Sequence, residues 1–165
     1  MEVLKVNGEL DKKKLAISIL VPVIGGSITG WLANRNAQKK YKKLKQPSFA
    51  PPAPVFPIVW TSLYAMMGLA KYRADQKVQQ GDKESPAIPI YDLQLGLNFL
   101  WSFLFFRWGL RGTALIEMTI LLGAIAMTAY EFQKKDITAG ALMVPYIGWV
   151  TFALVLNFAV WKLNK

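Results

Sequence analysis

Five long apolar blocks, separated by charged connections, constrain this chain more than any other feature of its sequence. The blocks are Leu15–Ala33, Phe56–Leu69, Ile88–Trp108, Thr113–Phe132 and Ile137–Trp161. A bilayer core about 30 Å thick is crossed by about 20 helical residues. The second block reaches that length only when Lys71, Tyr72 and Arg73 end its helix, because long cationic side chains can extend to the headgroups. The pattern predicts an all-α bundle of five transmembrane helices. Their spans are expected at residues 14–33, 56–73, 88–108, 113–133 and 137–161.

A soluble helical bundle is the alternative, and the distribution of charge weighs against it. Between Thr113 and Phe132 only Glu117 and Glu131 are charged, and the fifth block carries no charge. A helix without a charged face has to be surrounded by apolar groups, and 165 residues are too few to bury five such helices. We expect a single domain, residues 1–165, integral to a membrane and of the type found in bacterial cell membranes.

The ionisable residues limit the chemistry that the chain can perform. Its net charge is +10, but the cations lie almost wholly between the apolar blocks, where anionic headgroups rather than nucleic acid explain them. The chain has neither Cys nor His, and no cluster of metal ligands or nucleophile–base pair is evident. We therefore expect no metal site and no catalytic residues. The 20 Lys and Arg residues divide equally between the two sides of a five-helix bundle, so they do not decide its orientation.

The first block admits two interpretations. A basic lead, Lys12-Lys13-Lys14, followed by an apolar run is typical of a signal peptide. The run nevertheless continues to Ala33 without a clear cleavage site, which favours a retained first span. Within it, Gly26 and Gly30 form a G-x-x-x-G pair that can admit a second helix or can fill a crowded contact within the bundle.

The most distinctive stretch is rich in proline and leads directly into the second block. Its prolines are Pro47, Pro51, Pro52, Pro54 and Pro57. Proline fixes φ and donates no hydrogen bond, so this part cannot be helix interior, although Pro57 suits a first helical turn. The preceding basic segment contains Tyr41. That segment is either an anchor for anionic lipid or a lid over the bundle, and the stiff prolines favour the lid.

Polar residues inside the spans indicate which faces point inward. Gln94, Asn98, Trp101 or Ser102, and Phe105 share one face of the third block. Amides are costly against lipid, and taken alone Asn98 is more typical of a hydrogen bond between helices than of a ligand contact. In the fourth block, Glu117 is expected to pair with Arg107 or Arg111. Residues 74–86, by contrast, are expected to form an ordinary solvated loop.

Aromatic side chains supply the binding surface that ionisable residues do not. Most of them fit the core or the membrane interface, but Trp60, Trp101 and Trp149 lie inside spans. An apolar pocket with a few polar groups is the usual form of a small-molecule site. Flat hydrophobic molecules such as tetrapyrroles or sterols would suit it, recognised by their faces rather than through a metal.

These motifs resemble those of the TspO/MBR family, the tryptophan-rich sensory or translocator proteins. The first group of matching residues is Tyr41, Leu44, Pro47, Ser48, Phe49, Pro51, Pro52, Pro57, Trp60, Leu63, Tyr64, Met67 and Gly68. Further matches continue through the last three spans. They include Leu97-Asn98-Phe99-x-Trp101, Phe105-Phe106, Ala114-Leu115-Ile116-Glu117, Pro145-Tyr146-x-x-Trp149, Phe152-Ala153 and Leu156-Asn157-Phe158-x-Val160-Trp161. The resemblance thus covers nearly the whole chain.

The resemblance implies a five-helix bundle, commonly a homodimer, that binds porphyrins, sterols and benzodiazepine-type drugs under its first loop. The pocket that it implies comprises Tyr41, Trp60, Tyr64, Asn98, Ser102, Phe105, Trp149 and Ala153. The implied lid contains Pro47, Pro51 and Pro52. One departure is Phe158, where the sterol-recognition stretch of the family has Tyr, with Lys162 as its basic residue. This departure makes sterol a poor candidate.

Three hypotheses about function follow. The first is a membrane sensor or transporter that binds porphyrins, such as haem or protoporphyrin IX, and similar flat ligands, with no cofactor required. The second is an enzyme that degrades porphyrins with light and oxygen, which the resemblance implies and which needs no acid–base residues. The third is a structural or partner-binding membrane protein, and it predicts a tightly filled core without a cavity. Membrane lipid is an expected partner in all three, and nucleic acid in none.

Overall fold

The computed structural model describes residues 2–33, 35, 37–81 and 84–165, and this part of the chain is mostly helical, without strands. Five long helices account for most of it. They are α1 (Lys12–Ala33), α3 (Val55–Gly81), α4 (Ala87–Ser102), α5 (Arg111–Lys135) and α6 (Ile137–Leu163). Three shorter elements connect or extend them. These are the 3₁₀ turn η1 (Glu2–Leu4), the helix α2 (Ala37–Lys43) and the π-helical turn η2 (Phe103–Arg107).

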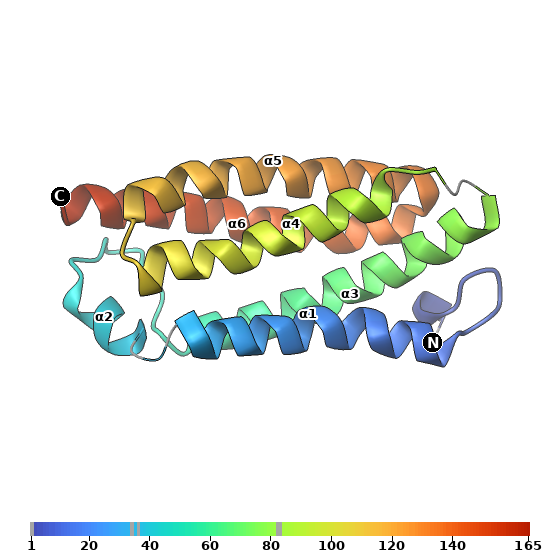
Figure 1. The fold of residues 1–165 in the computed structure, drawn as a ribbon, viewed down its shortest axis with the longest axis horizontal. Coiled ribbons are helices and arrows are strands. Elements are labelled where there is room, and N and C mark those ends of the chain that lie inside the picture. The colour runs from blue at the N-terminus through green and yellow to red at the C-terminus, as the bar shows by residue number, and fades with distance from the viewer. Residues whose placement is uncertain (1, 34, 36, 82–83) are drawn as a thin grey trace.

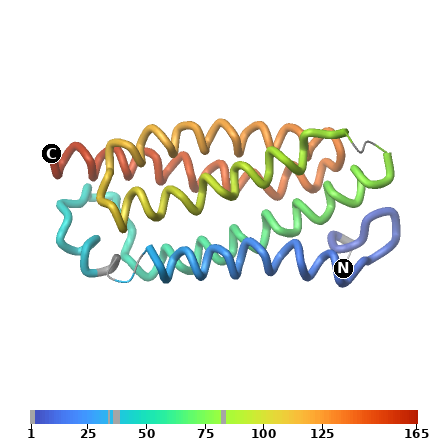
Figure 2. The backbone as a smooth tube through the Cα atoms, in the orientation of Figure 1, coloured from blue at the N-terminus to red at the C-terminus, as the bar shows by residue number. Residues whose placement is uncertain are grey.

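The long helices run side by side along the length of the molecule (Figure 1). α1 packs mainly on α3, α5 packs between α4 and α6, and α3 also lies against α6. The two termini lie at opposite ends of the bundle (Figure 2). The end that carries the C-terminus also holds α2 and the turn between η2 and α5. An odd number of long antiparallel helices accounts for this separation of the termini.

The helix boundaries follow from local chemistry. α3 begins at Val55, directly after the proline run, so that Pro57 falls in its first turn as expected. α6 begins after Asp136, whose carboxylate accepts a hydrogen bond of 2.8 Å from the Ala139 N–H. Such a side-chain cap satisfies one of the free amides at a helix start.

The expectation of a solvated loop at residues 74–86 is wrong for its first half, because α3 continues to Gly81. The polar last turns of α3 find partners in the N-terminal segment and at the start of α6. Arg73 donates two hydrogen bonds to Asp136, of 2.9 and 2.8 Å, and others to the carbonyls of Val3 and Lys5. Lys77 bonds to Asn7. These polar contacts add to the burial of Ala74 and Val78, which belong to the hydrophobic core, and together they hold this part of α3 in place.

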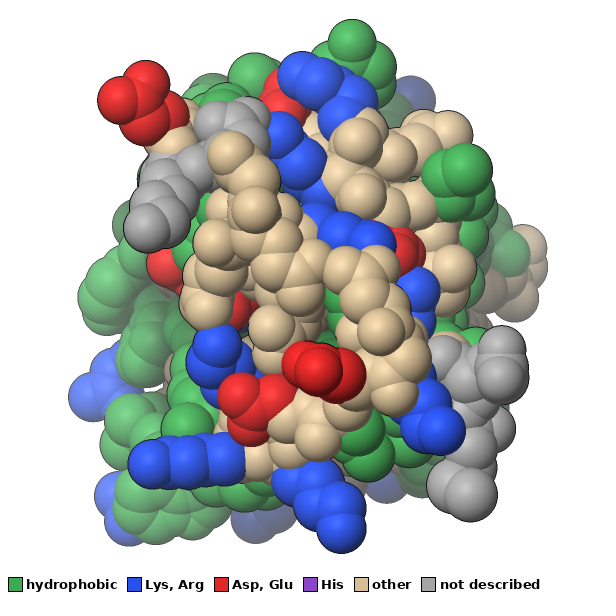
Figure 3. Space-filling view, turned by 90° about the vertical axis from the view of Figure 1, so that its right-hand side faces the viewer, with side chains coloured by type: hydrophobic (Ala, Val, Ile, Leu, Met, Phe, Trp, Pro, Cys, Tyr) green, Lys and Arg blue, Asp and Glu red, His purple; other side chains and the backbone are tan. Residues whose placement is uncertain are grey.

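Three helices, α1, α5 and α6, are long and apolar enough by themselves to cross a membrane. The other two differ for local reasons. The apolar part of α3 ends at Ala70, before Lys71 and Arg73, and α4 has 16 residues because its path continues as the π-helical turn η2. At the end that holds the N-terminus, Lys, Arg, Asp and Glu side chains gather, with hydrophobic groups around the margin (Figure 3). This distribution of charge suits an end face outside the hydrocarbon core.

Two glycines set the close contact between α1 and α3. A Cβ atom at Gly26 would lie 2.2 Å from the ring of Tyr64, and one at Gly68 would lie 2.4 Å from the carbonyl oxygen of Ser18. Real Cβ atoms do not approach other atoms so closely. Of the two interpretations of the glycine pair in α1, the structure therefore uses Gly26 for a crowded contact within the bundle.

Candidate functional site

A cavity of about 530 Å³ lies between α1, α3 and α4, under α2. We call it the aromatic cavity. Its lining residues are Gly26, Ser27, Gly30, Arg35, Lys39, Tyr41, Ala53, Phe56, Pro57, Trp60, Thr61, Tyr64, Trp101, Ser102 and Phe106. The volume falls within the about 300–1,000 Å³ typical of small-molecule sites. The tightly filled core expected of a purely structural protein is not what this region contains.

Rings from two helices make the inner wall of the aromatic cavity. Trp60 stacks on Tyr64 with ring centroids 5.6 Å apart, as expected for residues one turn apart on α3. The indole of Trp60 also approaches that of Trp101 on α4, at 6.4 Å between centroids. Trp101 in turn stacks on Phe105 at 5.4 Å and meets the edge of Phe106 at 5.8 Å. The wall is therefore a continuous aromatic surface that an apolar ring system can contact over a wide area.

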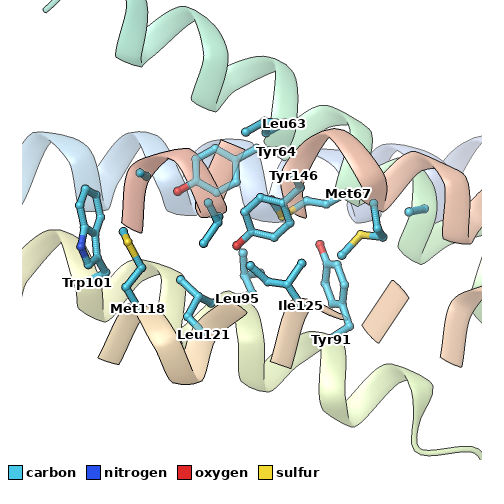
Figure 4. Close-up of a cluster of buried hydrophobic side chains, with 14 of the residues drawn as sticks. Leu63, Tyr64, Met67, Tyr91, Leu95, Trp101, Met118, Leu121, Ile125 and Tyr146 are labelled. Atoms are coloured by element: carbon cyan, nitrogen blue, oxygen red, sulfur yellow. The ribbon is translucent and has the colours of Figure 1, made fainter. Parts of the chain in front are cut away.

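Buried hydrogen bonds fix the orientation of this wall from behind, and they involve Tyr64 and Tyr146, whose side chains lie within the buried cluster of Figure 4. Tyr64 donates to the Asn98 side-chain oxygen at 2.6 Å, and the Asn98 amide donates to the Tyr146 hydroxyl at 2.8 Å. Tyr146 donates to Gln94 at 3.0 Å. All four side chains are buried. These three bonds restrict the rotamers of their members, so they hold α3, α4 and α6 in one register around the cavity, although the Nε2 of Gln94 is buried without a partner among the described residues.

The segment predicted to be a lid lies against the cavity at the end of the bundle that holds the C-terminus. Tyr41 of α2 is buried there, and its ring meets the edge of the Phe56 ring at 5.4 Å. Its hydroxyl donates to the Pro51 carbonyl at 3.3 Å, and Gln46 donates to the Tyr41 carbonyl. Burial raises the pKa of the Tyr41 hydroxyl, so this group remains a hydrogen-bond donor at neutral pH. These contacts tie α2 to the proline run.

Two cations line the same end of the cavity. Arg35 lies over the Trp31 ring at 4.8 Å from its centroid, and Lys39 is an exposed residue of α2. None of the described residues that line this cavity is acidic. The cavity is consequently apolar on its inner wall and positively charged towards the solvent.

The predicted site residues fall into three groups in the structure. Tyr41, Trp60, Tyr64 and Ser102 line the aromatic cavity. Asn98 stands behind the wall, bonded to Tyr64. The others lie outside it: Phe105 is buried against Trp101, Trp149 packs on Phe56 at 5.9 Å, and Ala153 is buried in the core. Among the lid prolines, Pro47 and Pro52 accept backbone bonds within turns, and Pro51 accepts from Tyr41; none of them lines the cavity.

Several lining residues were not among the predicted site residues. Gly26, Ser27 and Gly30 bring α1 into the cavity wall, and the spacing of the two glycines was the available indication of a close approach. Arg35 precedes α2 and Lys39 lies within it, and both were interpreted only as part of a basic segment. The contribution of Tyr146 depends on contacts between distant helices, and no local pattern reveals it.

The groups that this arrangement presents are mainly aromatic rings, with a few hydroxyls and cations. The described residues include no group of acidic side chains that could hold a metal ion. Glu117 was expected to pair with Arg107 or Arg111. This prediction is wrong, since its carboxylate pairs with neither arginine. What remains is stacking and apolar contact on the inner wall, hydroxyl and amide groups behind it, and cations at its outer end.

Comparison with known proteins agrees with this architecture. The family model described as TspO/MBR matches residues 18–162. A tryptophan-rich sensory protein of Cereibacter sphaeroides is 40% identical over 124 residues, which are 75% of this chain and 76% of that protein. A tryptophan-rich protein TspO of Archaeoglobus fulgidus is 36% identical over 154 residues, or 92% and 97% of the two chains. The translocator protein of Sus scrofa is 34% identical over 152 residues, or 88% and 87%.

The match reaches from the first long helix to the end of the last one, and it includes the proline run and the residues of the aromatic wall. Helices of membrane-spanning length accompany it. On these grounds the chain belongs to the TspO/MBR family of integral membrane proteins.

Proposed function

We propose that this protein crosses the membrane five times and binds flat, hydrophobic molecules of the porphyrin type in the aromatic cavity, under the α2 lid. The observation that carries the proposal is the cavity itself, walled by Trp60, Tyr64 and Trp101. The opposite placement of the termini supports an odd number of spans. Binding and release of a ligand beneath a lid would suit a sensor or a transporter.

The shape and polarity of the cavity support a ligand with an extended ring system and acidic groups. Each aromatic contact contributes about 0.5–1.5 kcal/mol beyond the burial of apolar area. Arg35 and Lys39 at the outer end favour carboxylates, such as the propionate groups of haem or protoporphyrin IX.

Tryptophan fluorescence of the detergent-solubilised protein tests the proposal. We expect saturable quenching on titration with protoporphyrin IX, with affinity lowered about tenfold in Trp60→Leu, because the variant removes a ring of the cavity wall on which the macrocycle would stack. Trp108→Leu is the matched control, since Trp108 is exposed and does not line the cavity. Quenching that does not saturate, or an equal loss of affinity in the two variants, would contradict the proposal.

A second candidate function is the degradation of a bound porphyrin with light and oxygen. The observation that favours it is the pair of tryptophans, Trp60 and Trp101, which line the cavity with ring centroids 6.4 Å apart. Either indole could donate an electron to an excited macrocycle. Illumination of the complex distinguishes the two functions. If the absorption of the bound porphyrin decays no faster than that of free porphyrin under the same light, the degradation hypothesis is wrong and only the binding proposal is left.

A further inference from the structure

A second recess, of about 370 Å³, lies between α2 and the turn that leads from η2 to α5. We call it the basic recess. Four cations line it: Lys40 and Lys43 from α2, Arg107 from η2, and Arg111 from the first turn of α5. They come from segments that are more than sixty residues apart in the sequence, so the fold and not a local charge run brings them together.

None of these four cations forms an ion pair among the described residues. Lys40 donates to the Phe106 carbonyl at 2.8 Å, and Arg107 donates to the Leu32 carbonyl at 3.2 Å. Both acceptors are neutral and leave the positive charge in place. None of the described residues that line the recess is acidic, and α5 begins there without an acidic residue in its first turn. Four like charges are thus held together without a counter-ion from the part of the chain that the structure describes.

The remaining lining is apolar and lies where the helices end. Phe105, Phe106 and Leu44 form part of it, and Trp108 stands beside them with 54% of its surface exposed. Exposed tryptophan at the end of a membrane helix is typical of the headgroup region. An occupant that combines a negative charge with an apolar part matches both halves of this recess.

From this geometry we propose that the basic recess binds the phosphate of an anionic phospholipid headgroup. Lys and Arg are the usual partners of phosphate oxygens, and basic pockets between helices at the membrane surface are a known means of binding acidic headgroups. The apolar side chains then contact the glycerol and the upper acyl chains. A free phosphate ion carries the same negative charge, but it has no apolar part that could contact the apolar side chains of the recess.

The recess and the aromatic cavity share structural elements. α2 supplies Tyr41 to the cavity and Lys40 and Lys43 to the recess, while Phe106 lines both. A bound headgroup therefore connects α2 to η2 and holds the lid closed. This consequence rests on the proposed function, whereas the lipid site itself does not.

Native mass spectrometry of delipidated protein tests the site without any porphyrin. We expect phosphatidylglycerol to bind more tightly than phosphatidylcholine, and the double variant Lys43→Gln, Arg111→Gln to lower its affinity about tenfold. The control is the double variant Lys42→Gln, Lys162→Gln. It removes the same amount of charge from the same end of the bundle, but neither of its two residues lines the recess. Lys43→Gln alone, on the exposed face of α2, gives a smaller loss without a risk to folding.

Three outcomes overturn the proposal. Equal loss of affinity in the two double variants would mean a diffuse surface charge, and equal binding of the two lipids would mean no headgroup selection. Displacement of phosphatidylglycerol by inorganic phosphate at the same concentration would assign the recess to a soluble anion.

For the lid, we expect protoporphyrin IX to bind more tightly in phosphatidylglycerol nanodiscs than in phosphatidylcholine nanodiscs. An absence of porphyrin binding in both would contradict the proposed function and leave the lipid result standing.

Discussion

At the scale of single residues, Gly26 determines how closely α1 approaches the wall of the aromatic cavity. Its missing side chain leaves space for the Tyr64 ring, which a Cβ atom would meet at 2.2 Å. Tyr64 in turn stacks on Trp60 and donates to Asn98 at 2.6 Å. Because Gly26 has no side chain, Tyr64 can keep the position in which it stacks on Trp60 and donates its hydrogen bond to Asn98.

We expect Gly26→Ala to displace Tyr64 and to weaken ligand binding together with stability. Overpacking of a well-packed site typically costs about 1–3 kcal/mol. Gly123→Ala is the control, because a Cβ atom there meets nothing within 4 Å and alanine favours the helix. Thermal unfolding in detergent and the porphyrin titration would measure both effects. Equal stability and affinity of the two variants would show that the contact at Gly26 has no consequence.

At the scale of helices, the contact of Arg73 with Asp136 joins the polar end of α3 to the start of α6. Both side chains are largely buried, at 10% and 9% exposure. Burial by itself would raise the pKa of Asp136, but the hydrogen bonds from Arg73 and the Ala139 amide, with the charges of Arg73 and Lys77, hold it below its ordinary value. The stabilisation is therefore complete at neutral pH and is lost as the pH falls through this lowered pKa, below about 4.

Asp136→Asn should lower the free energy of unfolding at pH 7 by about 3 kcal/mol, because it leaves the buried Arg73 without a charged partner while the helix cap is kept. It should also remove part of the acid sensitivity. Asp92→Asn is the comparison, since Asp92 pairs with Lys71 but is 56% exposed, and its loss should cost less than about 1 kcal/mol. Unfolding curves at pH 7 and pH 3 would measure this. A larger effect at Asp92 would contradict the assignment.

The elements divide clearly into those that local sequence predicts and those that it does not. Apolar length predicted the five long helices, and proline chemistry predicted the start of α3. The continuation of α3 to Gly81 was missed because its residues are polar and depend on Arg73 and its distant partners. In the site, Trp60 and Tyr64 were implied by the resemblance to the TspO/MBR family, and both line the cavity. The hydrogen bond of Asn98 to Tyr146 joins residues 48 positions apart, which no local pattern can reveal.

At the scale of the whole molecule, the position of the termini at opposite ends of the bundle predicts opposite sides of the membrane (Figure 2). The chain contains no cysteine, so single cysteines can report on each end separately. We expect Glu9→Cys and Lys165→Cys, both at exposed positions, to react with a membrane-impermeant thiol reagent from opposite sides of oriented vesicles. Labelling of both from the same side would require an even number of spans.

The central claim is that a flat ring ligand lies against the tryptophan wall of the aromatic cavity, under α2. A crystal structure of the complex with protoporphyrin IX measures this directly. We predict the macrocycle in contact with Trp60 and Trp101, Tyr41 closed over it, and its carboxylates towards Arg35 and Lys39. A macrocycle bound on the outer, lipid-facing surface of the helices, with the cavity left without it, would contradict the account.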